Sequence, residues 1–169
     1  YAAFCRWHMK TYGTTQRQIA AVCAKNHQHS VHNPWSQFRK PFTIDEVLAA
    51  PPITYPITLP MCAPLSDGAA AAIVCSEDGL KRIGADRSRC IRVAASVIRS
   101  FSHRRLDEPG KHVSRLAALQ AYEMAGLGPE DMDVAEVHDA SAMGEIMQAE
   151  NLGLVPLGGR PMVAHVLDR

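Results

Sequence analysis

The second half of the chain twice places a short apolar run before an amphipathic helical pattern. Residues 91–98 (IRVAASVI) have the composition of a strand, and residues 112–125 follow with apolar side chains at three- and four-residue steps. Residues 134–137 form a second apolar run, and helical spacing resumes after Ser141. Strands that alternate with helices favour an α/β layered fold with a mainly parallel sheet.

The first part of the chain carries two helical patterns separated by a break. Residues 1–11 have the pattern of a helix, which Gly13 should end. Thr14 or Thr15 can cap a second helix over residues 16–30, because threonine hydroxyls accept hydrogen bonds from the free N–H groups of a first turn.

Prolines and a capping signature organise the next segment. Residues 32–42 should be irregular, whereas Thr43 and Glu46 have the spacing of a capping box that starts a short helix. The proline-rich residues 51–60 read as an extended connection. Residues 69–75 fit either a buried strand or a tightly packed helix.

Composition excludes several classes of partner and site. The formal net charge is +1, so there is no electrostatic case for nucleic acid as a partner. No apolar run approaches the roughly 20 residues of a membrane-spanning helix. The odd number of cysteines without a C-x-x-C pair argues against a disulfide framework and for five small buried hydrophobic residues in a reducing compartment (Cys5, Cys23, Cys62, Cys75 and Cys90).

The start of the chain, YAAFCRWHMK, lies in the middle of an amphipathic pattern. It has no initiator methionine, signal peptide or transit-peptide bias. We therefore expect the chain to be an internal piece of a considerably longer protein.

His138 and Asp139 stand between an apolar run and a helical pattern. A histidine next to the free N–H groups of a helix N-terminus could stabilise a developing negative charge. Simpler interpretations are a hydrogen-bonded core histidine at a strand end, and a helix cap for Asp139 or Ser141.

Other chemical sites fit the sequence less well. Cys62 has no nucleophile-elbow motif or local basic partner, so a structural or pocket-lining role is favoured. A hydrolase triad of Ser66, Asp67 and His138 lacks geometric support, and Ser66-Asp67-Gly68 is typical of a turn.

Three histidines close together, at positions 27, 29 and 32, suggest a metal site at first sight. On one helix, positions 27 and 32 lie about 140° apart, so the three side chains would not converge. No cysteine or carboxylate completes a zinc set at standard spacing, and we predict no metal.

Three stretches together resemble the thiolase family, and within it the sterol-carrier-protein-type branch. KNHQHSVHNPWSQF (residues 25–38) resembles a helix-to-loop signature of that branch, and CAPLSDGAAAA (residues 62–72) resembles the loop near its coenzyme A site. AGLGPEDMDVAEVHDASAMGEIMQAENLGLVP (residues 125–156) resembles the strand and helix that carry an oxyanion-hole residue. The stretches occur in the family's order.

The resemblance implies a thiolase-like layered fold that is incomplete. Residues 1–90 would end the N-terminal thiolase half, including most of its inserted loop region, and residues 91–169 would begin the C-terminal half. The family's nucleophilic cysteine, Gly-His-Pro histidine and C-x-Gly-Gly cysteine have no match here. We therefore expect this chain alone to lack thiolase activity.

The resemblance also assigns site residues. His138 would form part of an oxyanion hole, with Asp139 in support, whereas Cys62, Ala63 and Ser66 would line the pocket near coenzyme A. The branch has phenylalanine where this chain has Ser141, so the packing beside the site should differ. No metal is implied.

The implied function is an acyl-CoA acyltransferase of the 3-ketoacyl-CoA thiolase type, with acyl-CoA as substrate and no permanently bound cofactor. Two alternatives remain: a steroid side-chain acyl-CoA aldolase, whose branch resembles Tyr-Asp at the place of His138 and Asp139, and a non-catalytic thiolase-like binding subunit. We expect a homodimer or higher oligomer in the intact protein, located in the cytoplasm or alternatively the peroxisome.

Overall fold

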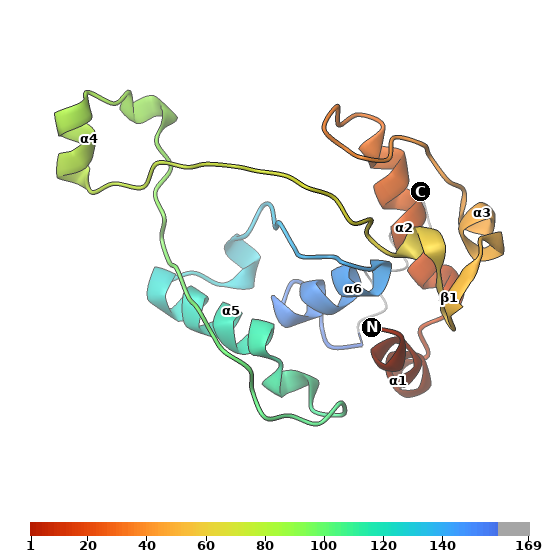
Figure 1. The fold of residues 1–169 in the computed structure, drawn as a ribbon. Coiled ribbons are helices and arrows are strands. Elements are labelled where there is room, and N and C mark those ends of the chain that lie inside the picture. Colours follow the sequence, from red (N-terminus) through yellow and green to blue (C-terminus); the bar gives the residue numbers. More distant parts are fainter. Residues whose placement is uncertain (159–169) are drawn as a thin grey trace.

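The fold is mainly helical in the computed structural model, which describes residues 1–158 (Figure 1). The helices are α1 (Ala2–Tyr12), α2 (Gln16–Ser30), α3 (Ile44–Ala49), α4 (Glu77–Ile83), α5 (Val113–Ala125) and α6 (Ala142–Asn151). The antiparallel strands β1 (Pro52–Thr54) and β2 (Ile57–Thr58) are the only sheet in this part of the chain. None of the described helices is long and apolar enough to cross a membrane.

Helices α1 and α2 begin and end as their sequences predict. Gly13 adopts φ 77°, a left-handed conformation that ends α1, and its N–H bonds the carbonyl of Met9. At the start of α2, the Thr15 hydroxyl accepts from the Gln18 N–H at 3.2 Å, and the Gln18 side chain accepts from the Thr15 N–H at 2.8 Å. Of the two predicted caps, Thr15 is therefore the one used, in a capping box.

Replacing this cap should have a measurable effect on stability. A Thr15→Ala variant loses the acceptor for the Gln18 N–H, and we expect unfolding to become easier by about 1 kcal/mol. Thr11→Ala is the matched control, because Thr11 is an exposed residue within α1 and alanine favours the helix. Urea denaturation of both variants checks the difference, and equal midpoints would contradict the capping role.

The segment after α2 contains the predicted capping box and an unpredicted hairpin. Thr43 and Glu46 bond each other reciprocally at the start of α3, as expected. The prediction of a plain extended connection over residues 51–60 was incomplete, since β1 and β2 pair around a cis Tyr55–Pro56 peptide. The Thr58 hydroxyl donates to the carbonyl of Val47 at 2.7 Å and fastens the hairpin to α3.

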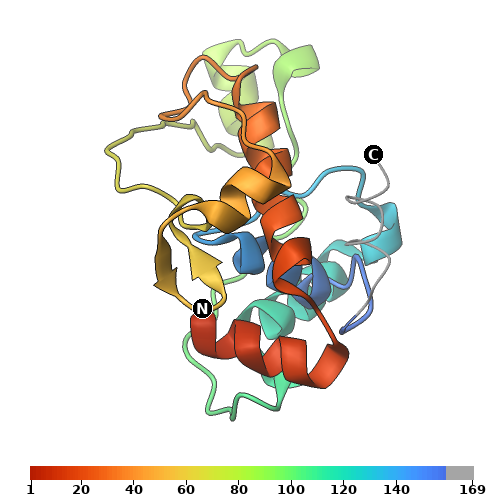
Figure 2. The same cartoon turned by 90° about the vertical axis from the view of Figure 1, so that its right-hand side faces the viewer.

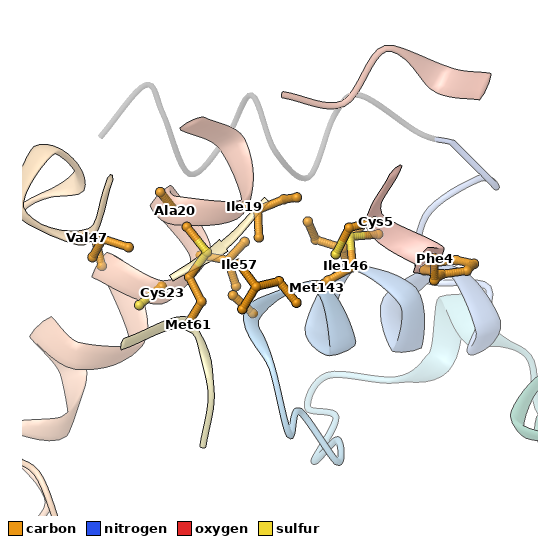
Figure 3. Packing of buried hydrophobic residues seen from close by; sticks show 13 residues of the cluster. Phe4, Cys5, Ile19, Ala20, Cys23, Val47, Ile57, Met61, Met143 and Ile146 are labelled. Carbon is orange, nitrogen blue, oxygen red and sulfur yellow. The ribbon is translucent and has the colours of Figure 1, made fainter. Parts of the chain in front are cut away.

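Helix α2 lies at the centre of the core. Its residues from Ile19 to Ala24 are all buried, and α3, α6 and the 3₁₀ turn η1 (Leu59–Met61) pack around them. Figure 3 shows Met143 and Ile146 of α6 facing this helix, as their helical spacing predicts. Burial of this apolar surface is the main force that holds α2 and α6 together.

The predicted parallel sheet is wrong for the described residues. Residues 69–75, 91–98 and 134–137 form neither strand nor helix, and Ile91 and Ile98 are 93% and 96% exposed. A strand is stable only when a neighbouring strand satisfies its backbone N–H and C=O groups. The described part of the chain offers these apolar runs no such neighbour.

Helices α4 and α5 follow the core segment along the chain. Figure 1 shows α4 lying apart from the other helices, joined to them by two long extended links. Helix α5 was predicted correctly: His112 caps it by accepting from the Ser114 N–H at 3.1 Å, and Gly126 ends it with φ 66°. Figure 2 shows α5 and α6 side by side.

A buried polar network joins α1 to the end of α6. Glu150 and His8 are 3% and 2% exposed, and their Oε1 and Nε2 atoms lie 3.0 Å apart. The other ring nitrogen of His8 contacts the Thr14 hydroxyl at 2.8 Å, and the Gly158 N–H donates to the same Glu150 oxygen at 2.9 Å. Each buried polar atom here has a partner, as a stable core requires.

Candidate functional site

The predicted oxyanion residues lie on the loop that enters α6. Ser141 holds the N-cap position with extended backbone, and its side chain makes no capping bond. His138 and Asp139 precede it, and both are exposed. The prediction that a buried strand delivers them is wrong, because Val134 is 80% exposed and unpaired in the described structure. Their position before a helix N-terminus is confirmed.

The predicted pocket-lining segment runs beside this loop. Cys62 and Ser141 form an isolated antiparallel bridge, and the Ala63 N–H donates to the carbonyl of Ala140 at 3.1 Å. Two stretches almost eighty positions apart in the sequence thus meet at the start of α6. Cys62 is half-buried, whereas Ala63 and His138 are exposed.

Ser66 is not brought into this arrangement by any described contact. It lies in the exposed irregular link that leads toward α4. No hydrogen bond within residues 1–158 joins Ser66 or Asp67 to His138, so the described structure gives the hydrolase triad no support. The pocket-lining role of Ser66 stays a prediction.

A polar cluster from α2 and α6 contacts Asp139. The Asn26 amide nitrogen lies 2.7 Å from Glu145 Oε2 and 3.3 Å from Asp139 Oδ2. The Lys25 ammonium pairs with the other Glu145 oxygen, and these two side chains are 30% and 14% exposed. The loop with His138 is therefore tied to the centre of the fold through side chains of α2.

Helix α6 and this loop approach each other closely at Gly144. A Cβ atom at position 144 would lie only 3.3 Å from the Cα of Asp139. Such a distance is tighter than ordinary van der Waals contact. The missing side chain lets the backbone of Asp139 rest against the first turn of α6.

The pKa of the Asp139 carboxyl is raised above its ordinary value. Neighbouring atoms remove water from it, although the residue as a whole remains exposed, and the nearby Glu145 charge adds to the effect. His138 and Lys25 act in the opposite direction. A carboxyl whose pKa is raised on folding stabilises the folded protein while it is protonated. This contribution to the free energy of unfolding is lost as pH rises through the folded-state pKa.

Carbon-13 NMR titration of the aspartate carboxyls should detect this shift. We expect Asp139 to titrate above the ordinary aspartate value, and a Glu145→Gln variant to lower that pKa because a like charge is removed. Asp86 is an internal reference, since hydrogen bonds from Ser88 lower its pKa. An Asp139 midpoint at or below that of Asp86 would contradict the described environment.

The buried cysteines are poor nucleophiles. Burial raises the pKa of Cys23 to about 12 and that of Cys5 to about 11, so their reactive thiolates are scarce at neutral pH. All five cysteines are free thiols. The prediction that each is a buried hydrophobic residue holds for Cys5 and Cys23, but Cys75 and Cys90 are exposed.

His27 has a structural environment. Its ring stands edge-on to Phe42 at 4.8 Å between centroids, and Nε2 lies 3.4 Å from the carbonyl of Pro60. His29 and His32 are exposed. Within residues 1–158, no group of three potential ligand side chains is placed to hold a metal ion.

The sequence reasoning missed the roles of Lys25, Asn26 and Glu145. Lys25 and Asn26 begin the stretch KNHQHSVHNPWSQF, but sequence alone does not show which loop they face. For Lys25 and Asn26, the available signal is their position on α2, directly after the run of buried residues from Ile19 to Ala24. Polar side chains there must either reach solvent or find partners on α6.

Comparison with known proteins shows what this chain is similar to. Residues 95–165 match the family described as "Thiolase C-terminal domain-like". Over 160 residues the chain is 38% identical to the benzoylsuccinyl-CoA thiolase subunit BbsB of Thauera aromatica, covering 94% of this chain and 41% of that protein. It is also 40% identical over 157 residues to sterol carrier protein 2 of Rattus norvegicus, covering 89% and 28% respectively.

A solved structure gives the same fold. The chain aligns with an Ltp2-ChsH2(DUF35) aldolase with a TM-score of 0.75 at 24% identity, over 99% of this chain and 44% of that chain. The fold is therefore thiolase-like, although its described part contains no parallel sheet. The chain contains a thiolase C-terminal-like domain and is similar to thiolases, and it spans less than half the length of these relatives.

Proposed function

We propose that this chain contributes to an acyltransferase of the 3-ketoacyl-CoA thiolase type. The observation that carries the proposal is the meeting of two distant segments at the start of α6, where Ala63 bonds Ala140, two residues after His138. This pairing supports the proposal, because it joins the expected coenzyme A-side segment to the loop that carries His138. An exposed imidazole before a helix N-terminus suits a carbonyl oxygen that gains negative charge.

In the proposed reaction a cysteine thiolate attacks the C3 ketone of a 3-ketoacyl-CoA. The C2–C3 bond breaks, and its electron pair moves into the enolate of the departing acyl-CoA. His138 would donate an N–H to that enolate oxygen, and protonation at C2 would give acetyl-CoA from an unbranched substrate. Coenzyme A thiol would then accept the acyl group from the cysteine. The nucleophile is not among the matched motifs of this chain.

The proposal extends to organisation. Residues 1–90 would belong to the first thiolase half and residues 91–169 to the second, of which residues 159–169 lie outside the described part. Exposed apolar side chains support association into a homodimer or higher oligomer (Leu65, Ile73, Ile91, Ile98 and Phe101). No permanently bound cofactor takes part.

Turnover assays test the function. The whole gene product should convert acetoacetyl-CoA and coenzyme A into acetyl-CoA, whereas the 169-residue chain alone should not. Robust turnover by the short chain would overturn the proposed need for further catalytic cysteines. Aldehyde or ketone release from a β-hydroxyacyl-CoA, without coenzyme A-dependent cleavage, would establish an aldolase instead. Coenzyme A binding without either reaction would indicate a non-catalytic subunit.

A further inference from the structure

The loop with His138 is held in place from two sides. On one side, the Ala63 N–H bonds the carbonyl of Ala140 at 3.1 Å. On the other, Asn26 reaches the Asp139 carboxylate, and the Asp139 backbone rests against Gly144. His138 itself makes no hydrogen bond within the described residues. The orientation of the His138 side chain therefore depends on how Asp139 and Ala140 are held.

Asn26 has the donors that this position needs. A primary amide carries two N–H donors, and the Asn26 nitrogen lies near one oxygen of each of two carboxylates, on Asp139 and Glu145. The Lys25 ammonium offsets the charge of Glu145 from the opposite side. The amide can thus bridge two like charges that would otherwise repel each other, because it adds no charge of its own.

We propose that Asn26, with Lys25 acting through Glu145, positions the His138–Asp139 loop for the reaction. This inference rests on the proposed oxyanion role of His138. Asn26 is a positioning residue here, since it contacts the loop and has no described contact with a reacting group. Glu145 links it to the rigid first turn of α6, and α2 supplies a fixed base at the centre of the core.

The first test is structural and needs no turnover. In the 169-residue chain, Asn26→Ala should shift the NMR imidazole resonances of His138. Gln28→Ala is the matched control, because Gln28 is an exposed amide on the same helix whose contact is the carbonyl of Phe42 at 3.5 Å. Unchanged His138 resonances in a folded Asn26→Ala protein would overturn the inference. If Asn26→Ala does not fold, Asn26→Ser replaces it in both tests.

The second test uses kcat of the whole gene product. We expect Asn26→Ala to lower kcat about 10- to 100-fold, since a misplacement of about 1 Å can cost that much. In an Asp139→Ala background the same substitution should have little further effect, because its partner on the loop is gone. Full additivity would indicate a general structural role and overturn the inference. Absence of thiolysis in the unmodified protein would instead refute the proposed function, and the NMR result would still decide the positioning.

Discussion

We expect Glu150→Ala to lower the free energy of unfolding more than any other single substitution proposed for this chain. The change leaves His8 buried without its partner and removes the acceptor for the Gly158 N–H. Leaving a buried hydrogen-bonding group without its partner costs about 1–3 kcal/mol. For a protein of this size, that corresponds to a fall in Tm of roughly 2–12 °C.

Two control variants show whether the loss of stability comes from the charge of Glu150 and from its buried position. Glu150→Gln keeps the shape and one acceptor oxygen, so it should cost less than alanine. Glu123→Ala, at an exposed glutamate near the end of α5, should change stability by about 0.5 kcal/mol or less. Thermal unfolding followed by circular dichroism provides the comparison. A Glu150→Ala protein as stable as Glu123→Ala would show that the network between α1 and α6 contributes nothing.

Substitution of His138 should have the largest effect on activity. In the whole gene product, His138→Ala should lower kcat for acetoacetyl-CoA thiolysis about 10²- to 10³-fold, the usual loss when one oxyanion-hole donor is removed. Stability should hardly change, because the side chain is exposed and makes no hydrogen bond in the described structure. His29→Ala, at another exposed histidine, should leave kcat unchanged. Equal kcat values in the two variants would contradict the oxyanion role.

Helices α1, α2, α3, α5 and α6 were predictable because their signals are local, whereas α4 was not predicted. Thr15, Thr43 and the glycines at 13 and 126 act within a few residues of the helix ends that they define. The apolar spacing of Met143 and Ile146 also predicts the buried face of α6. Such patterns depend on helix geometry, which the chain carries within each segment.

The strand predictions failed for a physical reason. Residues 91–98 and 134–137 have strand composition, but strand formation requires hydrogen bonds to a neighbour that lies far along the chain or beyond it. Composition cannot supply that neighbour. The hairpin of residues 52–58 was missed for a different reason: its strands are only three and two residues long and lie within a proline-rich stretch.

The candidate site was predictable only in part. The sequence indicated His138 and Asp139 before a helix, and the structure pairs Cys62 and Ala63 with the next two residues, Ala140 and Ser141. It did not indicate that Asn26 bonds both Asp139 and Glu145, since those contacts span more than a hundred residues. These long-range side-chain contacts follow from the packing of α2 on α6. The apolar spacing within each helix predicts its buried face, but it does not predict how the two helices are oriented relative to each other.

Hydrogen exchange at the reacting carbon tests the central claim most directly, because it reports enolate formation at the thioester. Acetyl-CoA incubated with the whole gene product in D₂O should gain deuterium at C2, and His138→Ala should slow this exchange by about the same 10²- to 10³-fold factor. His29→Ala should exchange at the unmodified rate. Equal exchange rates for the His138→Ala and unmodified proteins would contradict the assignment of His138 as the group that stabilises the enolate.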